Sequence, residues 1–221
     1  MFALPFTGIQ FIRVGHQHNT ELPITEAFDP SDNSICEVTQ SFFDFTANHH
    51  GDAGVTQGMA CDYVFNMGLC CGGRFGLVSG GGNTRYLINP ACGTLDNSGW
   101  TSATSMPKAL AGHASLVYND EWLISGGYGS IKDSYCLTIN QCLFISDTTG
   151  AAQNKVYSLS SGGVWTTLDI EMPRARYGHC MVNYGMNQIA ILGGRPDADN
   201  VRIAEVDIYN FDTQEWLPGP E

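Results

Sequence analysis

Histidine pairs are the residues of this chain whose spacing comes closest to that of a metal site. His16 and His18 are two residues apart, and His49 and His50 are adjacent. An imidazole nitrogen can bind zinc or copper, but a metal centre needs further ligands around the ion. Neither pair has a carboxylate or thiolate at a convincing distance in the sequence, so we expect no metal site and no cofactor.

The cysteines point to disulfides rather than to a metal or a nucleophile. The chain has eight cysteines, an even number that suggests an oxidising compartment. Cys70 and Cys71 are adjacent and cannot act as a metal-binding Cys-x-x-Cys pair, so oxidised pairing with Cys61 or Cys92 is the more natural expectation. The candidates for disulfide bonding are Cys71, Cys92, Cys136 and Cys142.

Other catalytic motifs are not found in the sequence. It contains no serine nucleophile elbow, no phosphate-binding Gly-x-x-x-x-Gly-Lys and no paired carboxylates at an interpretable spacing. The triple glycine from Gly80 to Gly82 is not followed by a helical pattern, which favours a turn over a nucleotide-binding loop. We therefore expect no catalytic residues and no enzymatic activity.

Two further histidines belong to an internal repeat, which favours a structural role for both. In two stretches, methionine and proline are followed by glycine and histidine, and then by an apolar run that ends in two glycines. The methionine, glycine and histidine recur 66 residues apart (172 − 106 for the methionine), and the double glycine recurs 67 residues apart. A repeat of this length determines the architecture before any single residue does. The landmarks are Met106, Pro107, Gly112, His113, Gly126 and Gly127, and then Met172, Pro173, Arg176, Gly178, His179, Gly193 and Gly194.

Each repeat is expected to be a four-stranded antiparallel blade. Residues 114–118 and 121–125 form a first hairpin with a two-residue turn at Asn119-Asp120. Residues 180–184 and 188–192 form the corresponding hairpin of the next repeat. A tyrosine and a tryptophan seven or eight residues later mark the second half of each blade, namely Tyr157 and Trp165, and Tyr209 and Trp216.

An insertion distinguishes the two repeats. There are 30 residues from Gly127 to Tyr157, but only 15 from Gly194 to Tyr209. Cys136 and Cys142 lie in the insertion and either staple its base or remain free thiols. Long loops on a rigid scaffold are common binding elements. The candidates for ligand-binding loop residues are Ser130, Lys132, Asp133, Arg195, Asp197 and Asp199.

The pattern is weaker upstream. The landmarks expected for the preceding repeat are Gly80, Gly81, Tyr86 and Trp100. The sequence Cys71-Gly72-Gly73 competes for the place of the double glycine, and the sequence leaves both alternatives open. Residues 11–15 and 26–30 resemble the last three strands of a degenerate first repeat, with Cys36 in place of tryptophan. The expected units are about 1–40, 41–104, 105–170 and 171–221.

Composition agrees with an all-β fold. The 221 residues include 26 glycines, 11% aromatic and only 14% charged residues, which suits short strands joined by tight turns. The net charge is −12 and no basic cluster is present, so nucleic acid is not an expected partner. The apolar runs are too short and too interrupted by glycine to cross a membrane.

The landmarks resemble the kelch repeat, in which an apolar strand ends in Gly-Gly and is followed by Tyr, Trp, Met-Pro, Arg and Gly-His. The cysteines beside them are similar to those of cysteine-bearing kelch proteins of invertebrate secreted or cell-surface type. The resemblance implies a kelch-type β-propeller, and the four units imply part of a larger ring. A closed four-bladed ring is the alternative.

The resemblance also implies a function. It favours a non-catalytic propeller that binds a protein or glycan through its inter-strand loops. The alternative is a propeller enzyme of the galactose-oxidase-like copper radical type or the sialic acid epimerase type. The cysteines favour a secreted, extracellular protein, whereas the first residues lack the pattern of a signal peptide and leave a cytoplasmic location as the alternative.

Overall fold

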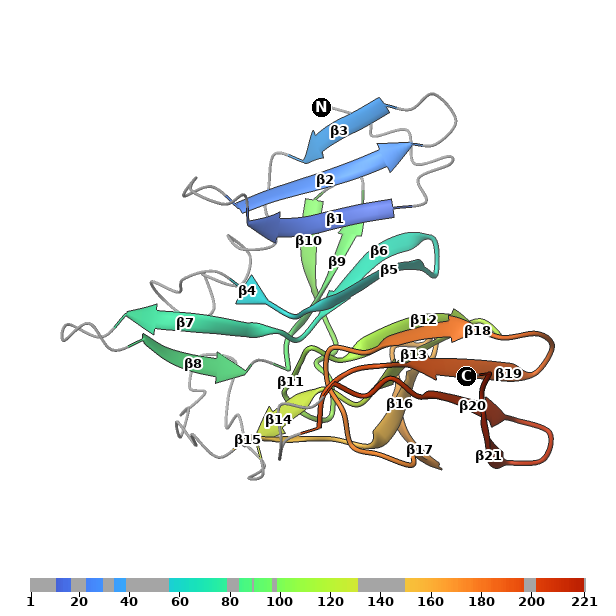
Figure 1. Ribbon diagram of the computed structural model, residues 1–221. Coiled ribbons are helices and arrows are strands. Elements are labelled where there is room, and N and C mark those ends of the chain that lie inside the picture. The colour runs from blue at the N-terminus through green and yellow to red at the C-terminus, as the bar shows by residue number, and fades with distance from the viewer. Residues whose placement is uncertain are drawn as a thin grey trace.

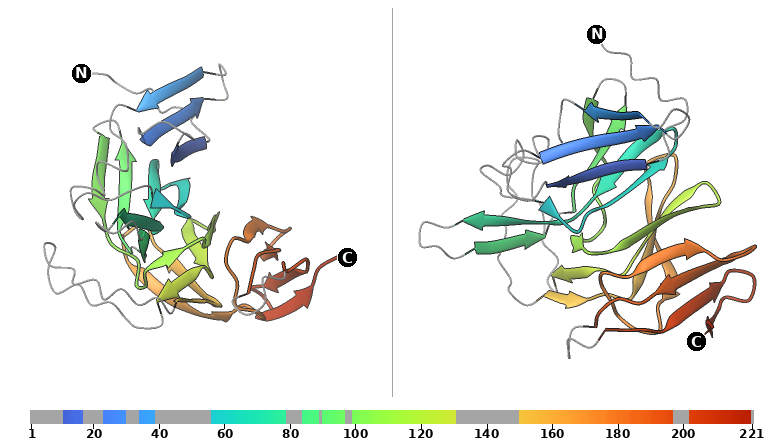
Figure 2. Two further views of the ribbon diagram at one scale, coloured as in Figure 1. Left: turned by 60° about the vertical axis from the view of Figure 1, so that its left-hand side comes forward. Right: turned by 45° about the horizontal axis from the view of Figure 1, so that its top comes forward.

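The computed structural model describes residues 11–16, 23–29, 34–38, 56–78, 84–88, 90–96, 99–130, 150–196 and 202–220. These residues form antiparallel sheets and contain no helix, so the chain is all-β as expected. No helix long and apolar enough to span a membrane was found among them. The sheets follow one another along an arc from the N-terminal to the C-terminal end (Figures 1 and 2).

Three four-stranded sheets form the main part of the arc, and we call them blades 2, 3 and 4. Blade 2 consists of β5 (Ala60–Val64), β6 (Met67–Cys71), β9 (Cys92–Asp96) and β10 (Gly99–Ala103). Blade 3 consists of β12 (Ala114–Tyr118), β13 (Glu121–Ser125), β16 (Lys155–Leu159) and β17 (Trp165–Glu171). Blade 4 consists of β18 (Cys180–Asn183), β19 (Gln188–Leu192), β20 (Val206–Asn210) and β21 (Glu215–Pro218). Each strand pairs with the next one of its blade, which is the expected meander.

Three smaller sheets accompany the blades. Blade 1 contains β1 (Phe11–His16), β2 (Pro23–Asp29) and β3 (Ser34–Val38), and β1 contacts β5 of blade 2. Beside blade 2 lie β4 (Thr56–Gln57), β7 (Arg74–Val78) and β8 (Thr84–Ile88). Beside blade 3 lie β11 (Leu110–Ala111), β14 (Tyr128–Ser130) and β15 (Gly150–Ala152). The last two sheets extend their blades past the double glycines.

Tight turns explain why these segments form hairpins. Phe65-Asn66 in blade 2 and Asn119-Asp120 in blade 3 join the first two strands, and all four residues have φ between 48° and 62°. A two-residue turn of this handedness matches the twist of the flanking strands, and asparagine and aspartate tolerate it better than most residues. The expected turn at Asn119-Asp120 is therefore formed.

Apolar side chains pack between successive blades. One cluster lies between blades 2 and 3, and we call it the 2–3 interface; it includes Leu69, Cys71, Trp122 and Ile124. A second cluster, the 3–4 interface, includes Ala114, Leu123, Met181 and Ile189. Side chains alternate along each strand, so each blade contributes one face to each neighbour.

Backbone hydrogen bonds between glycines join the inner edges of the blades. The amide of Gly112 donates to the carbonyl oxygen of Gly58 at 2.6 Å, and the amide of Gly178 donates to that of Gly112 at 2.7 Å. All three glycines have φ between 63° and 70°, in the left-handed region that residues with a Cβ rarely adopt. Gly58 therefore begins blade 2 as Gly112 and Gly178 begin blades 3 and 4, and Met59 stands where the other two blades have histidine.

The double glycine of blade 2 is Gly72-Gly73. Gly72 lies under the side chains of Met106 and His113, as Gly126 lies under Met172 and His179. A Cβ on either glycine would come within 2.6 Å of a carbonyl oxygen of the next blade, so only glycine fits. The prediction that Gly80 and Gly81 hold this place was wrong, because blade 2 turns eight residues earlier; their own structure lies outside the described residues.

The tyrosine landmarks were also partly wrong. Tyr86 lies in β8, in the small sheet beside blade 2, and not in the third strand of the blade. Tyr157 pairs with Ile124, two residues from the double glycine, whereas Tyr209 pairs with Ile189, four residues from it. The counterpart of Tyr209 in blade 3 is therefore Leu159, and Tyr157 corresponds to Asp207 of blade 4, which pairs with Ile191 two residues from its double glycine.

The tryptophans do stand in register. Trp100 pairs with Leu95, Trp165 with Leu159 and Trp216 with Tyr209. Each partner in turn pairs with the residue four before the double glycine of its blade. The indole of Trp165 donates to the carbonyl oxygen of Thr104 at 2.9 Å and so ties blade 3 to the end of blade 2.

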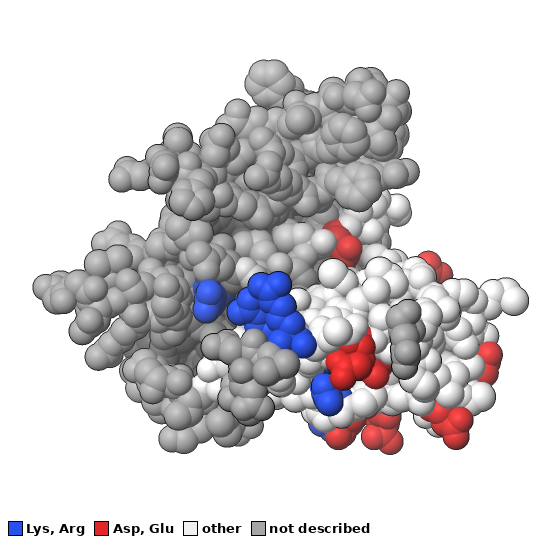
Figure 3. Space-filling model, viewed as in Figure 1, with Lys and Arg blue, Asp and Glu red and all other residues white. Residues whose placement is uncertain are grey.

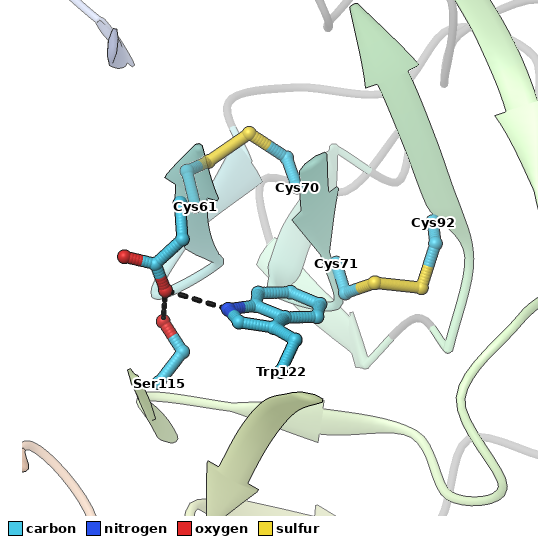
Figure 4. The surroundings of a disulfide bond; sticks show 7 residues. Cys61, Cys70, Cys71, Cys92, Ser115 and Trp122 are labelled. Carbon is cyan, nitrogen blue, oxygen red and sulfur yellow. Dashed lines mark hydrogen bonds between the residues drawn. A yellow bond between two sulfur atoms is a disulfide. The ribbon is translucent and has the colours of Figure 1, made fainter. Parts of the chain in front are cut away.

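Two disulfides staple blade 2. Cys61 and Cys70 face each other across β5 and β6, and Cys71 and Cys92 face each other across β6 and β9, and both pairs are bonded (Figure 4). The adjacent cysteines thus point to opposite faces of the sheet, as successive residues of a strand must. Cys180 is a free, exposed thiol. Cys136 and Cys142 lie outside the described residues.

A polar cluster crosses the 2–3 interface. Asp62 Oδ2 accepts a hydrogen bond from the Trp122 indole at 2.6 Å and another from the Ser115 hydroxyl (Figure 4). Strand register places Leu116, Ile189 and Met181 at the corresponding positions of the 3–4 interface. The same three positions are therefore polar in one interface and apolar in the next.

Candidate binding face

One end of the blades gathers the segments most suited to ligand contact, and we call it the loop face. There the second strand of each blade ends in its double glycine and the first strand begins after Gly58, Gly112 or Gly178. The connections between second and third strands also leave from this end, and in blades 2 and 3 they form the added hairpins β7–β8 and β14–β15. Inserted loops on a rigid sheet scaffold are common ligand-binding elements.

Equivalent residues of three blades line up on the loop face. Arg74 pairs with Gln57, Tyr128 with Ala111 and Arg195 with Tyr177, each directly after a double glycine. The arginines at both ends of this row are exposed, and Tyr128 is half-buried between them. The row therefore presents a cationic, an aromatic and a second cationic side chain from three successive blades.

Aromatic contacts join blades 3 and 4 on this face. The rings of Tyr128 and Tyr177 meet edge to face, with centroids 5.6 Å apart. The backbone of Tyr177 exchanges two hydrogen bonds with that of Arg195, at 2.9 and 3.0 Å. A Cβ at Gly150 would overlap the ring of Tyr128, so glycine lets β15 run close under that tyrosine.

A lysine and a glutamine complete the row on blade 3. Lys108 Nζ donates to Gln153 Oε1 at 2.8 Å, and Gln153 Nε2 donates to the carbonyl oxygen of Ala151 at 2.8 Å. The backbone N–H of Gln153 donates to the carbonyl oxygen of Gly127, which anchors this residue next to Tyr128. These contacts fix Lys108, Gln153, Tyr128, Tyr177 and Arg195 in one group.

Two buried histidines lie beneath the loop face. His179 Nε2 and the Ser125 hydroxyl are hydrogen-bonded at 2.8 Å, while its Nδ1 has no partner in the described part of the chain. Neither ring nitrogen of His113 has a hydrogen-bond partner there. Cys71 takes the place of Ser125 in blade 2, and its sulfur is bonded to Cys92 and carries no proton to donate.

Burial keeps both imidazoles neutral. Burial lowers the pKa of His113 to about 4, and a nearby Cys71 backbone group only partly opposes this. Burial, helped by the charge of Arg176 and by His113, lowers the pKa of His179 to about 3. Both side chains are uncharged near neutral pH and pack against the double glycines, His113 against Gly72 and Gly127 and His179 against Gly126 and Gly194.

Arg176 is the other ionisable group buried beneath this face. Its guanidinium forms an ion pair with Asp207 and donates to the carbonyl oxygen of Gly193 at 3.1 Å. A buried guanidinium is stable only when paired and hydrogen-bonded, and here its partners belong to its own blade. Arg176 therefore stabilises the Gly193 turn and is not presented to a ligand.

The remaining predicted residues fall into two groups. Met106 and Met172 are buried over the double glycines, and Pro107 and Pro173 are exposed beside them. Of the binding-loop candidates, Arg195 lies on the loop face and Ser130 ends β14. Those outside the described residues are Lys132, Asp133, Asp197 and Asp199.

Tyr128, Tyr177, Lys108 and Gln153 were missed as binding candidates. They are brought together by pairing and contacts between segments far apart in the sequence, such as Lys108 with Gln153 and Tyr128 with Tyr177, which no local pattern indicates. Basic side chains gather near the centre of the view in Figure 3, and acidic ones lie mainly over the C-terminal part. Within the described segments, no group of three or more His, Cys, Asp or Glu residues could hold a metal ion.

Comparison with known proteins supports the fold. No protein-family model matches the chain, and no curated protein matches it. A solved structure described as "Structure of YjhT" aligns with a TM-score of 0.58 and 18% identity over 89% of this chain. The fold is a β-propeller. The propeller chain spans 52% of the YjhT chain, about half its length, and at this identity the likeness shows the fold alone.

Proposed function

We propose that this propeller is a non-catalytic binding module of the kelch type that recognises a protein or glycan through its loop face. The observation that carries the proposal is the row Arg74, Tyr128 and Arg195, in which equivalent positions of three blades present chemically useful side chains at one end. Interfaces and ligand sites are enriched in tyrosine and arginine, which combine apolar area with polar groups.

The ligand class follows from this row. Guanidinium groups form paired hydrogen bonds with carboxylates and sulfates, and tyrosine edges and hydroxyls suit polar groups and sugar hydroxyls. The chain has net charge −12, so exposed arginines on one face run against its overall charge. The preferred ligand is therefore an anionic glycan or an acidic protein segment. The disulfides of blade 2 favour an extracellular setting, where such ligands are common.

Binding measurements with face-specific variants test the proposal. Purified protein is screened against neutral, carboxylated and sulfated glycans and against acidic peptides, and Kd is measured for the best probe. Arg195→Ala and Tyr177→Phe test the loop face, and Glu215→Ala, at the exposed start of β21 on the opposite end of blade 4, is the control. We expect Arg195→Ala to weaken binding by about tenfold or more. Binding that is equally strong in the Arg195 and Glu215 variants would contradict the proposal.

A propeller enzyme is the second candidate. His113 and His179 favour it, since their imidazoles are neutral and three of their ring nitrogens have no partner in the described segments. Copper analysis of the purified protein, an alcohol oxidase assay and NMR of sialic acid interconversion separate the two candidates. Turnover abolished by His179→Ala, with the fold intact, would replace the binding proposal by the enzyme.

A further inference from the structure

Two equivalent histidines of the chain differ in their hydrogen bonds. His179 Nε2 is hydrogen-bonded to the Ser125 hydroxyl at 2.8 Å, whereas neither ring nitrogen of His113 has a partner in the described part of the chain. His113 is only 6% exposed, so its ring nitrogens are largely withdrawn from solvent as well. A buried polar group without a partner costs free energy, and in a folded protein it calls for an explanation.

The two imidazole rings occupy the same place in their interfaces. A Cβ on Gly72 would lie 2.7 Å from His113 Cε1, and a Cβ on Gly126 would lie 2.7 Å from His179 Cε1. Each Cβ would also lie 2.6 or 2.7 Å from a methionine methyl group and 2.6 Å from a carbonyl oxygen of the next blade. Both rings are therefore placed alike relative to the residue that precedes each double glycine.

That preceding residue is Cys71 in blade 2 and Ser125 in blade 3. Cys71 is bonded to Cys92 of the neighbouring strand, so its sulfur has no proton to donate to the ring. A backbone group of Cys71 is close enough to His113 to oppose part of the effect of burial on its pKa, which places the ring beside this cysteine. The disulfide thus explains why His113 lacks the hydrogen bond that the serine provides in the next interface.

Both sulfurs of this disulfide have a potential hydrogen-bond acceptor nearby. Cys92 Sγ lies 3.8 Å from the carbonyl oxygen of Pro90, within reach of a hydrogen bond from a thiol. The neutral imidazole that burial favours for His113 has one ring nitrogen that accepts. Two thiols at these positions would therefore be satisfied, whereas the bonded sulfurs can use neither acceptor.

We propose that Cys71–Cys92 is a redox-responsive disulfide, which the neighbouring His113 makes easier to reduce. The reductant is a dithiol that supplies two electrons and two protons: its two S–H bonds and the Cys71–Cys92 bond break, and it leaves as a cyclic disulfide. Cys71 and Cys92 become thiols, and the Cys71 thiol donates to a ring nitrogen of His113. The reduced 2–3 interface then has the counterpart of the hydrogen bond between Ser125 and His179.

The second disulfide of blade 2 lies away from this histidine. Cys61 and Cys70 are bonded on the opposite face of the sheet, whereas Cys71–Cys92 lies in the 2–3 interface beside Trp122 (Figure 4). The Cys61–Cys70 bond keeps β5 and β6 cross-linked when Cys71–Cys92 is reduced. Reduction of Cys71–Cys92 therefore removes only the covalent link between β6 and β9, and the backbone pairing of these strands is left.

Redox equilibration of the whole chain tests the proposal. Wild type, His113→Met and His179→Met are equilibrated with mixtures of reduced and oxidised dithiothreitol, quenched with acid and alkylated in denaturant. Trypsin releases Cys92 in residues 86–108, a peptide with no other cysteine, so mass spectrometry gives the reduced fraction of Cys71–Cys92. Both cysteines are buried, so the mixtures are incubated until the reduced fraction is constant.

We expect half-reduction of Cys71–Cys92 in His113→Met to need a ratio of reduced to oxidised dithiothreitol about tenfold higher than in wild type. The reason is that methionine leaves the Cys71 thiol without a nitrogen acceptor. His179→Met, which removes the equivalent histidine of the next interface, is expected to match wild type.

The direction of the change separates the proposal from a general loss of stability, because a less stable fold makes a buried disulfide easier to reduce. An equal or lower ratio for His113→Met than for wild type would overturn the proposal. The same increase in His113→Met and His179→Met would overturn it too, since the effect would not depend on the histidine beside Cys71.

A second pair of variants keeps the test decisive if His113→Met does not fold. Cys92→Ala is combined with either Cys71→Ser or Cys71→Ala, so that neither chain forms this disulfide. The chain with Cys71→Ser is expected to melt about 3 °C higher, because its hydroxyl can hydrogen-bond His113 as Ser125 bonds His179. An equal or lower melting temperature for this chain would show that a side chain at position 71 cannot bond the ring, and the proposal would fail.

Discussion

The 2–3 and 3–4 interfaces are built from the same positions with different chemistry. In the 2–3 interface Asp62 binds Trp122 and Ser115, and Cys71 is part of a disulfide beside His113, whose ring nitrogens have no hydrogen-bond partner in the described part of the chain. In the 3–4 interface apolar side chains replace the first group, and Ser125 binds His179. The backbone contacts are alike in both, so the glycines fix where blades stack and the side chains decide which blades match.

The largest expected effect is the loss of Trp122. Its indole is fully buried between blades 2 and 3, and it is also a hydrogen-bond donor to Asp62. Trp122→Ala is expected to lower the free energy of unfolding by about 4 kcal/mol, and the matched Ile189→Ala by about 3 kcal/mol. Urea denaturation measures both. A smaller loss for Trp122→Ala than for Ile189→Ala would show that the polar cluster contributes nothing.

Acid should weaken both interfaces through their histidines. The folded-state pKa is about 4 for His113 and about 3 for His179, below the ordinary 6.5, so the unfolded chain binds more protons between these values. The free energy of unfolding is therefore highest above about pH 6.5. It falls as the pH drops toward 4, by about 2 kcal/mol per histidine between pH 7 and pH 5.

Denaturation curves at several pH values, compared between wild type and His113→Met, check this acid sensitivity. The variant is expected to lose about half of the pH dependence, since one histidine remains in the 3–4 interface. If the free energy of unfolding of His113→Met depended on pH as steeply as that of the wild type, other groups would have to titrate in this range.

Removing the carboxylate alone should also weaken the 2–3 interface. Asp62→Leu leaves the Trp122 and Ser115 donors without an acceptor and is expected to destabilise the chain by about 2 kcal/mol. The triple variant Asp62→Leu, Ser115→Met, Trp122→Ile copies the 3–4 interface and should recover part of that loss. Thermal melts of both variants provide the comparison, and a triple variant less stable than Asp62→Leu would show that the two interfaces are not interchangeable.

The smallest effect concerns the serine beside His179. Ser125→Ala removes the partner of His179 Nε2, so it makes the 3–4 interface resemble the 2–3 interface at this point, and about 1 kcal/mol of stability should be lost. His113→Met at pH 8 is the control, because His113 has no hydrogen bond to lose in the described segments. Equal losses for the two variants would indicate that the Ser125–His179 bond adds no stability.

Local sequence patterns were sufficient to predict much of the fold. Glycine, proline and the Asn119-Asp120 turn act through backbone conformation, so the all-β fold, the hairpin at Asn119-Asp120 and the double glycines of blades 3 and 4 could be read directly. The double glycine of blade 2 was ambiguous because Gly72-Gly73 and Gly80-Gly81 satisfy the same local requirement. Only the contact of Gly72 with Met106 and His113 of the next blade distinguishes them.

Contacts between blades could not be predicted from the sequence patterns. Asp62 and Trp122 are 60 residues apart, and nothing local to either residue indicates the hydrogen bond between them. The row of Arg74, Tyr128 and Arg195 likewise becomes visible only when each double glycine is placed. The tyrosine spacing misled because the turn between the third and fourth strands differs in length: Leu159 pairs with Trp165 six residues later, whereas Tyr209 pairs with Trp216 seven residues later.

The hydrogen bonds among Gly58, Gly112 and Gly178 have a consequence for how such a chain can evolve. They join main-chain atoms only, so a duplicated gene segment that encodes a blade brings its own joint with it. Side-chain differences such as Asp62 against Leu116 can then accumulate afterwards without breaking the joint. Insertion or loss of whole blades is therefore an easier evolutionary step for this architecture than a change of the glycines at its inner edge.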